Sequence, residues 1–154
     1  MAILRIRDKR NDLLCVDLKD LLRLLAPESL GATWIVSSIN SELGHEWFDA
    51  TGEGGAFLES LAHRNARLCG RQLTALAERA RQVVWGEFVG WTSGKTDRTW
   101  VRIRAIGGMF YDVDSDDPAV LRKIRATYED VELIATADCQ NESGKQPGLT
   151  ARPC

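Results

Sequence analysis

The pattern of apolar and polar positions is clearest between Gln82 and Asp117, where three segments rich in Val, Ile, Phe, Trp and Tyr follow one another. A polar turn separates the first two segments, and a Gly-Gly pair separates the second from the third. β-Branched and aromatic residues between turn signals are typical of antiparallel strands joined by short loops. The pattern therefore predicts a three-stranded meander over residues 82–114.

Helical spacing of apolar residues appears in three places outside this meander. Leucines crowd one face of residues 17–26, where Asp17 can cap the first turn. Residues 56–81 carry apolar side chains every three or four positions, and Gly70 is a point at which this helix can divide in two. Asp117 can cap a third helix. We therefore expect three helices.

Shorter strand signals lie at about residues 2–7, 32–39 and 131–135. The first strand is expected to return through residues 13–16 as a hairpin, whereas residues 40–55 are polar and glycine-rich and are expected to form a loop. This order of elements is not the strict alternation of a doubly wound sheet. It indicates an α+β fold with a mostly antiparallel sheet and three helices packed mainly on one face.

Length and charge narrow the function classes. The chain has 154 residues, and its 20 basic and 22 acidic residues give a net charge of -2, too close to neutral for a general nucleic-acid binder. No apolar run approaches the ~20 residues of a membrane span, so no membrane association is expected. Residues 1–137 are predicted to form a single α+β domain. Residues 138–154 have almost no apolar content and are predicted to be a disordered tail.

The four cysteines lie far apart in the sequence and form no CxxC pair. Zinc-site spacing is therefore absent, and we expect no cofactor. The simplest setting for these cysteines is the reduced cytoplasm, with Cys15 and Cys69 as small core residues. The first ten residues also lack the charged-then-apolar order of a signal peptide. The sequence therefore predicts a cytoplasmic location.

A candidate binding loop contains the segment GHEWFD. Its histidine and glutamate are in the order found in the helix motif of zinc proteases. Asp49 stands where that motif has its second histidine, and the glycines around the segment do not favour a long helix. We therefore predict no metal site here, and keep as candidate loop residues His45, Glu46, Trp47 and Asp49.

Asp112 and Asp114 have the alternating carboxylates that begin a calcium-binding loop. The positions that such a loop needs as glycine and glutamate hold Asp117 and Lys123, so this interpretation fails. The two aspartates are expected at a strand end, beside the cap of the third helix. Weak magnesium binding by these carboxylates together with Glu87 stays open as an alternative.

Glu87 is a charged residue in the middle of an apolar strand. One register pairs it with Arg102 or Arg104 of the next strand, which explains it as a cross-strand ion pair. A register shifted by one residue turns it toward the apolar face, where it would be a perturbed carboxylate. We favour the first register because it places charge beside charge.

The favoured register gathers tryptophan and arginine side chains on one face of the meander, since residues two apart in a strand share a face. Trp and Arg are enriched at binding hot spots. Whether helices cover this face stays open at this point. The candidate partner-binding residues are Trp85, Glu87, Trp91, Trp100, Arg102, Arg104, Asp112 and Asp114.

The run Trp100–Ile134, WVRIRAIGGMFYDVDSDDPAVLRKIRATYEDVELI, resembles a segment of small uncharacterised bacterial α+β proteins, some of them immunity-protein-like. The shared pattern is a hydrophobic strand, a tight turn, an aromatic strand ending in Asp, a capped helix and a closing strand. The resemblance covers less than a quarter of the chain. It implies a fold, and no functional residue is carried over from it.

The leading hypothesis is a non-catalytic protein-binding domain, in its most concrete form an immunity-like inhibitor of a bacterial toxin. It is motivated by the absence of a catalytic constellation, since there is no GxSxG and the two imidazoles are His45 and His63. One alternative is a small hydrolase or metal-dependent enzyme that uses the sheet carboxylates. A second is an RNA-binding module that uses exposed tryptophans and an arginine-rich helix face formed by Arg64, Arg67 and Arg71.

Overall fold

A computed structural model of the chain describes residues 1–40, 43–92 and 98–136. Its main element is an eight-stranded sheet with the order β12-β1-β11-β10-β9-β4-β8, in which β7 also pairs with β9. The pairings within this sheet are antiparallel, so the α+β class and the mostly antiparallel sheet are confirmed. Its strands are β1 (Ala2–Ile6), β4 (Thr33–Ser37), β7 (Asp49–Thr51), β8 (Arg67–Cys69), β9 (Gln82–Trp91), β10 (Val101–Ile106), β11 (Phe110–Ser115) and β12 (Val131–Thr136).

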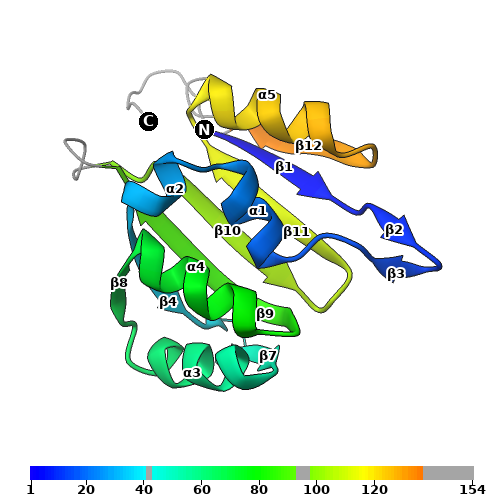
Figure 1. The fold of residues 1–154 in the computed structure, drawn as a ribbon. Helices are drawn as coiled ribbons and strands as arrows, with labels where there is room; N and C mark the ends of the chain where they lie inside the picture. The colour runs from blue at the N-terminus through cyan, green and yellow to red at the C-terminus, as the bar shows by residue number, and fades with distance from the viewer. Residues whose placement is uncertain (41–42, 93–97, 137–154) are drawn as a thin grey trace.

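The helices gather on one side of this sheet. Figure 1 shows α1, α4 and α5 in front of the strands, and the buried side chains of the helices join those of the strands in one core. Within β10, Val101, Ile103 and Ala105 are buried on the helix side, while the residues between them point to the other face. The helices are α1 (Leu18–Leu24), α2 (Glu28–Gly31), α3 (Glu53–Ala62), α4 (Gly70–Arg79) and α5 (Pro118–Thr127).

The described residues contain five helices, two more than the sequence predicts. The expected helix over residues 56–81 is wrong as a single element, because β8 separates α3 from α4. β8 pairs with β4 at the edge of the sheet, where Arg67 lies opposite Ile35 and Cys69 opposite Thr33. The break lies where Gly70 begins α4, as the lower helix propensity of glycine indicates. The remaining extra helix is α2.

Two strand pairings also differ from expectation. β1 does not return to residues 13–16; it lies between β11 and β12. A separate two-stranded hairpin of β2 (Lys9–Arg10) and β3 (Leu13–Leu14) follows it. The expected loop over residues 40–55 contains β7 and part of a second hairpin, formed by β5 (Ile39–Asn40) and β6 (Glu46–Trp47).

Cys15 and Cys69 are exposed, so their expected place in the core is wrong. Cys69 ends the edge strand β8 and caps α4, a position that faces solvent rather than the core. The predicted tail, residues 138–154, lies outside the described residues. Of the helices that the structure describes, none has the length and apolar character that a membrane crossing requires.

Candidate functional site

The face of the sheet opposite the helices, called here the open face, carries two neighbouring rows of side chains that cross six strands. The register defines both rows. From β12 to β4, the charged row consists of Glu132, Arg5, Asp112, Arg104, Glu87 and Ser37. In the same order, the mixed row consists of Ala135, Ile3, Asp114, Arg102, Val89 and Ile35. Acidic and basic groups therefore alternate along the charged row.

Arg5 is the most firmly held member of the charged row. Its Nε donates to Asp112 Oδ1 across 2.8 Å, and its Nη2 donates to Asp112 Oδ2 across 2.9 Å. This bidentate hydrogen bond raises the pKa of Arg5 above its ordinary value. The guanidinium carbon also lies 3.9 Å from the centre of the Phe110 ring, a cation-π contact. Arg5 and Asp112 thus form a fixed pair in the middle of the open face.

Glu87 lies directly opposite Arg104 in the register, so the ion-paired alignment favoured from the sequence is confirmed. Its carboxylate oxygens are 3.4 Å from Arg102 Nε and 3.7 Å from Arg104 Nε. Both distances exceed the ~2.9 Å of an ordinary N–H···O hydrogen bond. The two guanidinium groups therefore hold Glu87 by charge attraction, and the pairing is looser than that of Arg5 with Asp112.

Asp114 is the least well satisfied carboxylate of the open face. Its side chain is only 14% exposed, and its nearest cation is Arg102 Nη1 at 3.8 Å. Among the described residues, Asp114 Oδ1 has no hydrogen-bond partner. Burial raises the pKa of Asp114, although the charges of Arg102, the N-terminal amine and Arg104 act in the opposite direction. The mixed row therefore contains a carboxylate whose charge is incompletely compensated.

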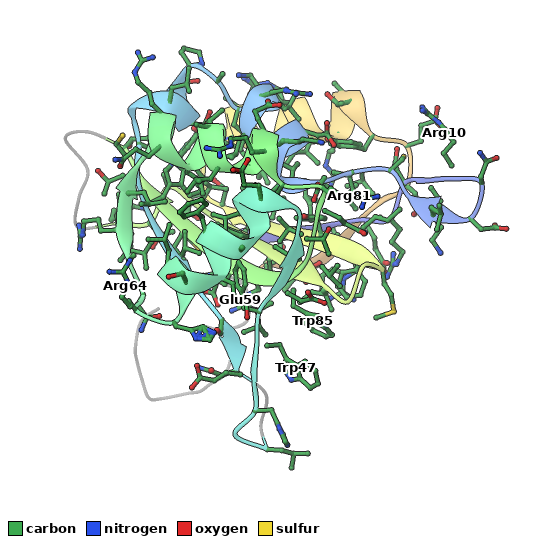
Figure 2. The ribbon with its side chains drawn as sticks, turned by 60° about the horizontal axis from the view of Figure 1, so that its bottom comes forward. Arg10, Trp47, Glu59, Arg64, Arg81 and Trp85 are labelled. Atoms are coloured by element: carbon green, nitrogen blue, oxygen red, sulfur yellow. The ribbon has the colours of Figure 1, made fainter. Side chains whose placement is uncertain are left out.

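A tryptophan pair, one member exposed and the other partly buried, adjoins these rows. The ring centres of Trp47 and Trp85 are 5.3 Å apart with a tilt of 31°, and Figure 2 shows the two side chains next to each other. Trp85 comes from β9, two residues before Glu87, whereas Trp47 comes from β6 and is 44% exposed. The stack thus joins the candidate loop to the candidate sheet residues in one surface.

Trp100 does not belong to the open face. Its Nε1 donates to Asp117 Oδ2 across 3.0 Å, and its ring packs edge-on against the buried Trp34 with centres 6.2 Å apart. It precedes the first residue of β10, so the alternation of strand residues does not extend to it. Its predicted grouping with Arg102 and Arg104 is therefore wrong. Trp91, at the end of β9, stays in the alternation with Glu87.

The loop candidates do not converge on a metal-binding geometry. Glu46 lies in β6, and Asp49 lies in β7 opposite Trp85. The His45 ring centre is 6.2 Å from that of Trp47. Across the described parts of the chain, no group of three or more His, Cys, Asp or Glu side chains is placed to hold a metal ion.

The residues that the RNA-binding and enzyme hypotheses require do not lie together in the way that each hypothesis needs. The three arginines expected on one helix face lie in a turn, in β8 and in α4. In the part of the chain that the structure describes, Glu87, Asp112 and Asp114 do not line the cavities of about 500 and 440 Å³. Instead they alternate with Arg5, Arg102 and Arg104.

Sequence reasoning missed several members of the open face, among them Ile3, Arg5, Phe110 and Glu132. The alternation of residues 2–7 is a signal for the first two, because it places Ile3 and Arg5 on one side of a strand. The partner of Arg5, however, is 107 residues away in the sequence. No local pattern identifies a pairing over that separation.

No protein-family model, curated protein or solved structure matches this chain.

Proposed function

We propose that this chain is a non-catalytic protein-binding domain, and that its partner sits on the open face and the adjoining Trp47–Trp85 stack. The observation that carries the proposal is the stack itself, with ring centres 5.3 Å apart. The sequence selects the loop residues and the meander residues independently. The stack joins these two groups in one continuous surface. A continuous surface is what a protein partner requires, since interfaces extend over many residues.

The composition of this surface suits protein recognition. Trp and Arg are the side chains that contribute most to binding energy at interfaces. Trp47 is 44% exposed, and Arg102 and Arg104 are 36% and 40% exposed, so all three can contact a partner. The alternating charges of the charged row supply electrostatic specificity, because a partner with the wrong order of charges meets like charges.

A narrower form of the proposal is an immunity-like inhibitor, which binds a bacterial toxin in the cytoplasm and blocks it. It rests on the resemblance of residues 100–134 to immunity-like proteins. That segment spans β10, β11, α5 and the first four residues of β12, and so reaches three of the six strands that carry the two rows. In this form, one copy of the chain stops the activity of one toxin molecule.

The test compares the native chain with Trp47→Ala as bait in a lysate of the source cells, followed by reconstitution with the purified captured protein. We expect a defined partner whose dissociation constant rises about tenfold or more in Trp47→Ala, the usual range for an aromatic hot spot. Calorimetry with the purified pair measures this change. If the partner is a toxin, its activity falls to zero at one equivalent of the native chain.

Leu13→Ala is the matched control, because Leu13 is 72% exposed but lies on the β2–β3 hairpin, away from the tryptophans. This variant is expected to bind like the native chain. Equal binding by Trp47→Ala and the native chain, with both variants folded, would contradict a partner site at the stack.

A further inference from the structure

The open face is complementary to itself in charge. Consider a twofold axis that lies in the plane of the face, parallel to the strands and midway between β10 and β11. Such an axis exchanges β10 with β11, β9 with β1, and β4 with β12, according to the strand order. Because the axis runs along the strands, each side chain faces a side chain of its own row in the second copy.

In the charged row, this operation brings opposite charges together. Asp112 faces Arg104 of the second copy, and Arg5 faces Glu87 of the second copy. At the margin, Glu132 faces the neutral Ser37 of the second copy. The twofold repeats each contact, so the row contains four acid–base contacts and no contact between like charges.

The mixed row obeys the same rule. Its charged pair is Asp114 facing Arg102 of the second copy. Its apolar residues meet apolar residues: Ile3 faces Val89 of the second copy, and Ala135 faces Ile35 of the second copy. The raised pKa of Asp114 agrees with this pairing, because the carboxylate gains a further cation.

Other twofold axes fail in at least one row. An axis midway between β1 and β11 also opposes unlike charges in the charged row, but in the mixed row it places Asp114 against Ile3 and Arg102 against Ala135 of the second copy. An axis along β11 places Asp112 against Asp112 of the second copy. An axis across the strands, between the rows, places Asp112 against Asp114 and Arg104 against Arg102. These last two arrangements oppose like charges, which costs several kcal/mol at an interface. Of these axes, only the one between β10 and β11 matches both rows.

We infer that the partner of the open face is a second copy of this chain, joined face to face about the axis between β10 and β11. This inference rests on the proposed protein-binding function and names a second copy, in place of a toxin, as the partner of the two rows. Packed sheets accept such an arrangement, with strand directions within about 30° of each other. Six strands ~4.8 Å apart and about five residues long give roughly 500 Å² per copy, so reversible dimerisation at micromolar concentration is expected.

The first test is sedimentation velocity of the native chain across the micromolar to sub-millimolar range. The expected result is a reversible shift from monomer to dimer, weakened by added NaCl because salt screens the facing charges. A monomer throughout this range overturns the inference.

The second test uses the variants Ile3→Asp and Val89→Lys to determine which residues of the two copies face each other. Each variant alone places a charge against an apolar residue of its second copy, and its dimer is expected to weaken about tenfold or more. In a 1:1 mixture, one contact pairs the new carboxylate with the new ammonium, and the other keeps native Val89 against native Ile3. The mixture should therefore dimerise better than either variant alone, and a mixture no better than its parts overturns the inferred axis.

Circular dichroism confirms that each variant is folded. If one is not, the pair Ala135→Asp and Ile35→Lys tests the same axis nearer the rim. Leu13→Asp, off the open face on the β2–β3 hairpin, is the control and should dimerise like the native chain.

The two proposals fail in different ways. A chain that stays monomeric but binds a foreign protein in a Trp47-dependent manner overturns the dimer and leaves the protein-binding function standing. A chain that neither dimerises nor binds a foreign protein overturns both proposals.

Discussion

The Tyr111 hydroxyl donates a hydrogen bond to Asp17 Oδ1 across 2.8 Å and thereby links the interior strand β11 to the start of α1. The same carboxylate oxygen accepts the backbone N–H of Val83 at 3.0 Å, so Asp17 connects the helix to two strands. Tyr111 is 1% exposed. Burial and the nearby Asp17 raise the pKa of Tyr111 well above its ordinary value, so its hydroxyl keeps the proton that it donates.

Tyr111→Phe should therefore lower the free energy of unfolding by about 1.5–3 kcal/mol, the range for a lost hydrogen bond to a charged group. Urea denaturation measures the change. Tyr128→Phe is the control, since none of the described residues forms a hydrogen bond with the half-buried Tyr128 hydroxyl. An equal loss in both variants would mean that the contact with Asp17 contributes nothing of its own.

Asp112 and Asp114 are neighbours on the open face whose removal should have opposite effects. Asp112→Asn weakens the bidentate contact with Arg5 and should cost about 1–3 kcal/mol. Asp114→Asn should instead stabilise the fold at neutral pH, because the folded state disfavours this charge. Both are measured by urea denaturation, at protein concentrations low enough to keep the chain monomeric.

The pH dependence distinguishes the two aspartates further. Since the pKa of Asp114 is raised in the folded state, the unfolded chain releases this proton first as pH rises. The contribution of Asp114 to the free energy of unfolding therefore falls as pH increases from the ordinary aspartate pKa to the raised folded value. The gain in Asp114→Asn should be present above this window and absent below it. A gain that is independent of pH would exclude the charge as its cause.

Gly70→Ala should destabilise the fold by about 3 kcal/mol or more, since a Cβ there would lie 1.9 Å from the Ser29 carbonyl oxygen and 2.6 Å from that of Leu30. Both obstacles are backbone atoms, which a side-chain rotation does not relieve. Gly31→Ala, with nothing within 4 Å of its Cβ, should change stability little. Thermal unfolding compares the two. Similar melting temperatures would show that α4 and α2 can separate at low cost.

The sequence predicts those parts of the fold that local pattern determines. The meander, its register at Glu87 and the cap of α5 by Asp117 follow from alternation and turn chemistry. β8 was missed because three residues with helical neighbours form a strand only through pairing with β4, about 35 residues earlier. Trp100 was misplaced because alternation was extended past the end of β10.

For the candidate site, the sequence supplies the residue types but not their neighbours. Glu87, Arg102 and Arg104 were grouped correctly because they lie on adjacent strands of one meander. Trp47 and Trp85 were chosen separately, since only the hairpin β5–β6 brings the rings together. Arg5 and Glu132 were missed because the register that places them on the open face joins distant parts of the chain.

The position of β1 between β11 and β12 also sets when the molecule can acquire its surface during synthesis. β1 leaves the ribosome before its partner strands, which lie more than a hundred residues later in the chain. Until Thr136 has emerged, no nascent chain can hold all six strands of the two rows together. Another protein can therefore bind to the two rows only after β12 has been translated. Binding to incomplete chains through this surface is thereby avoided.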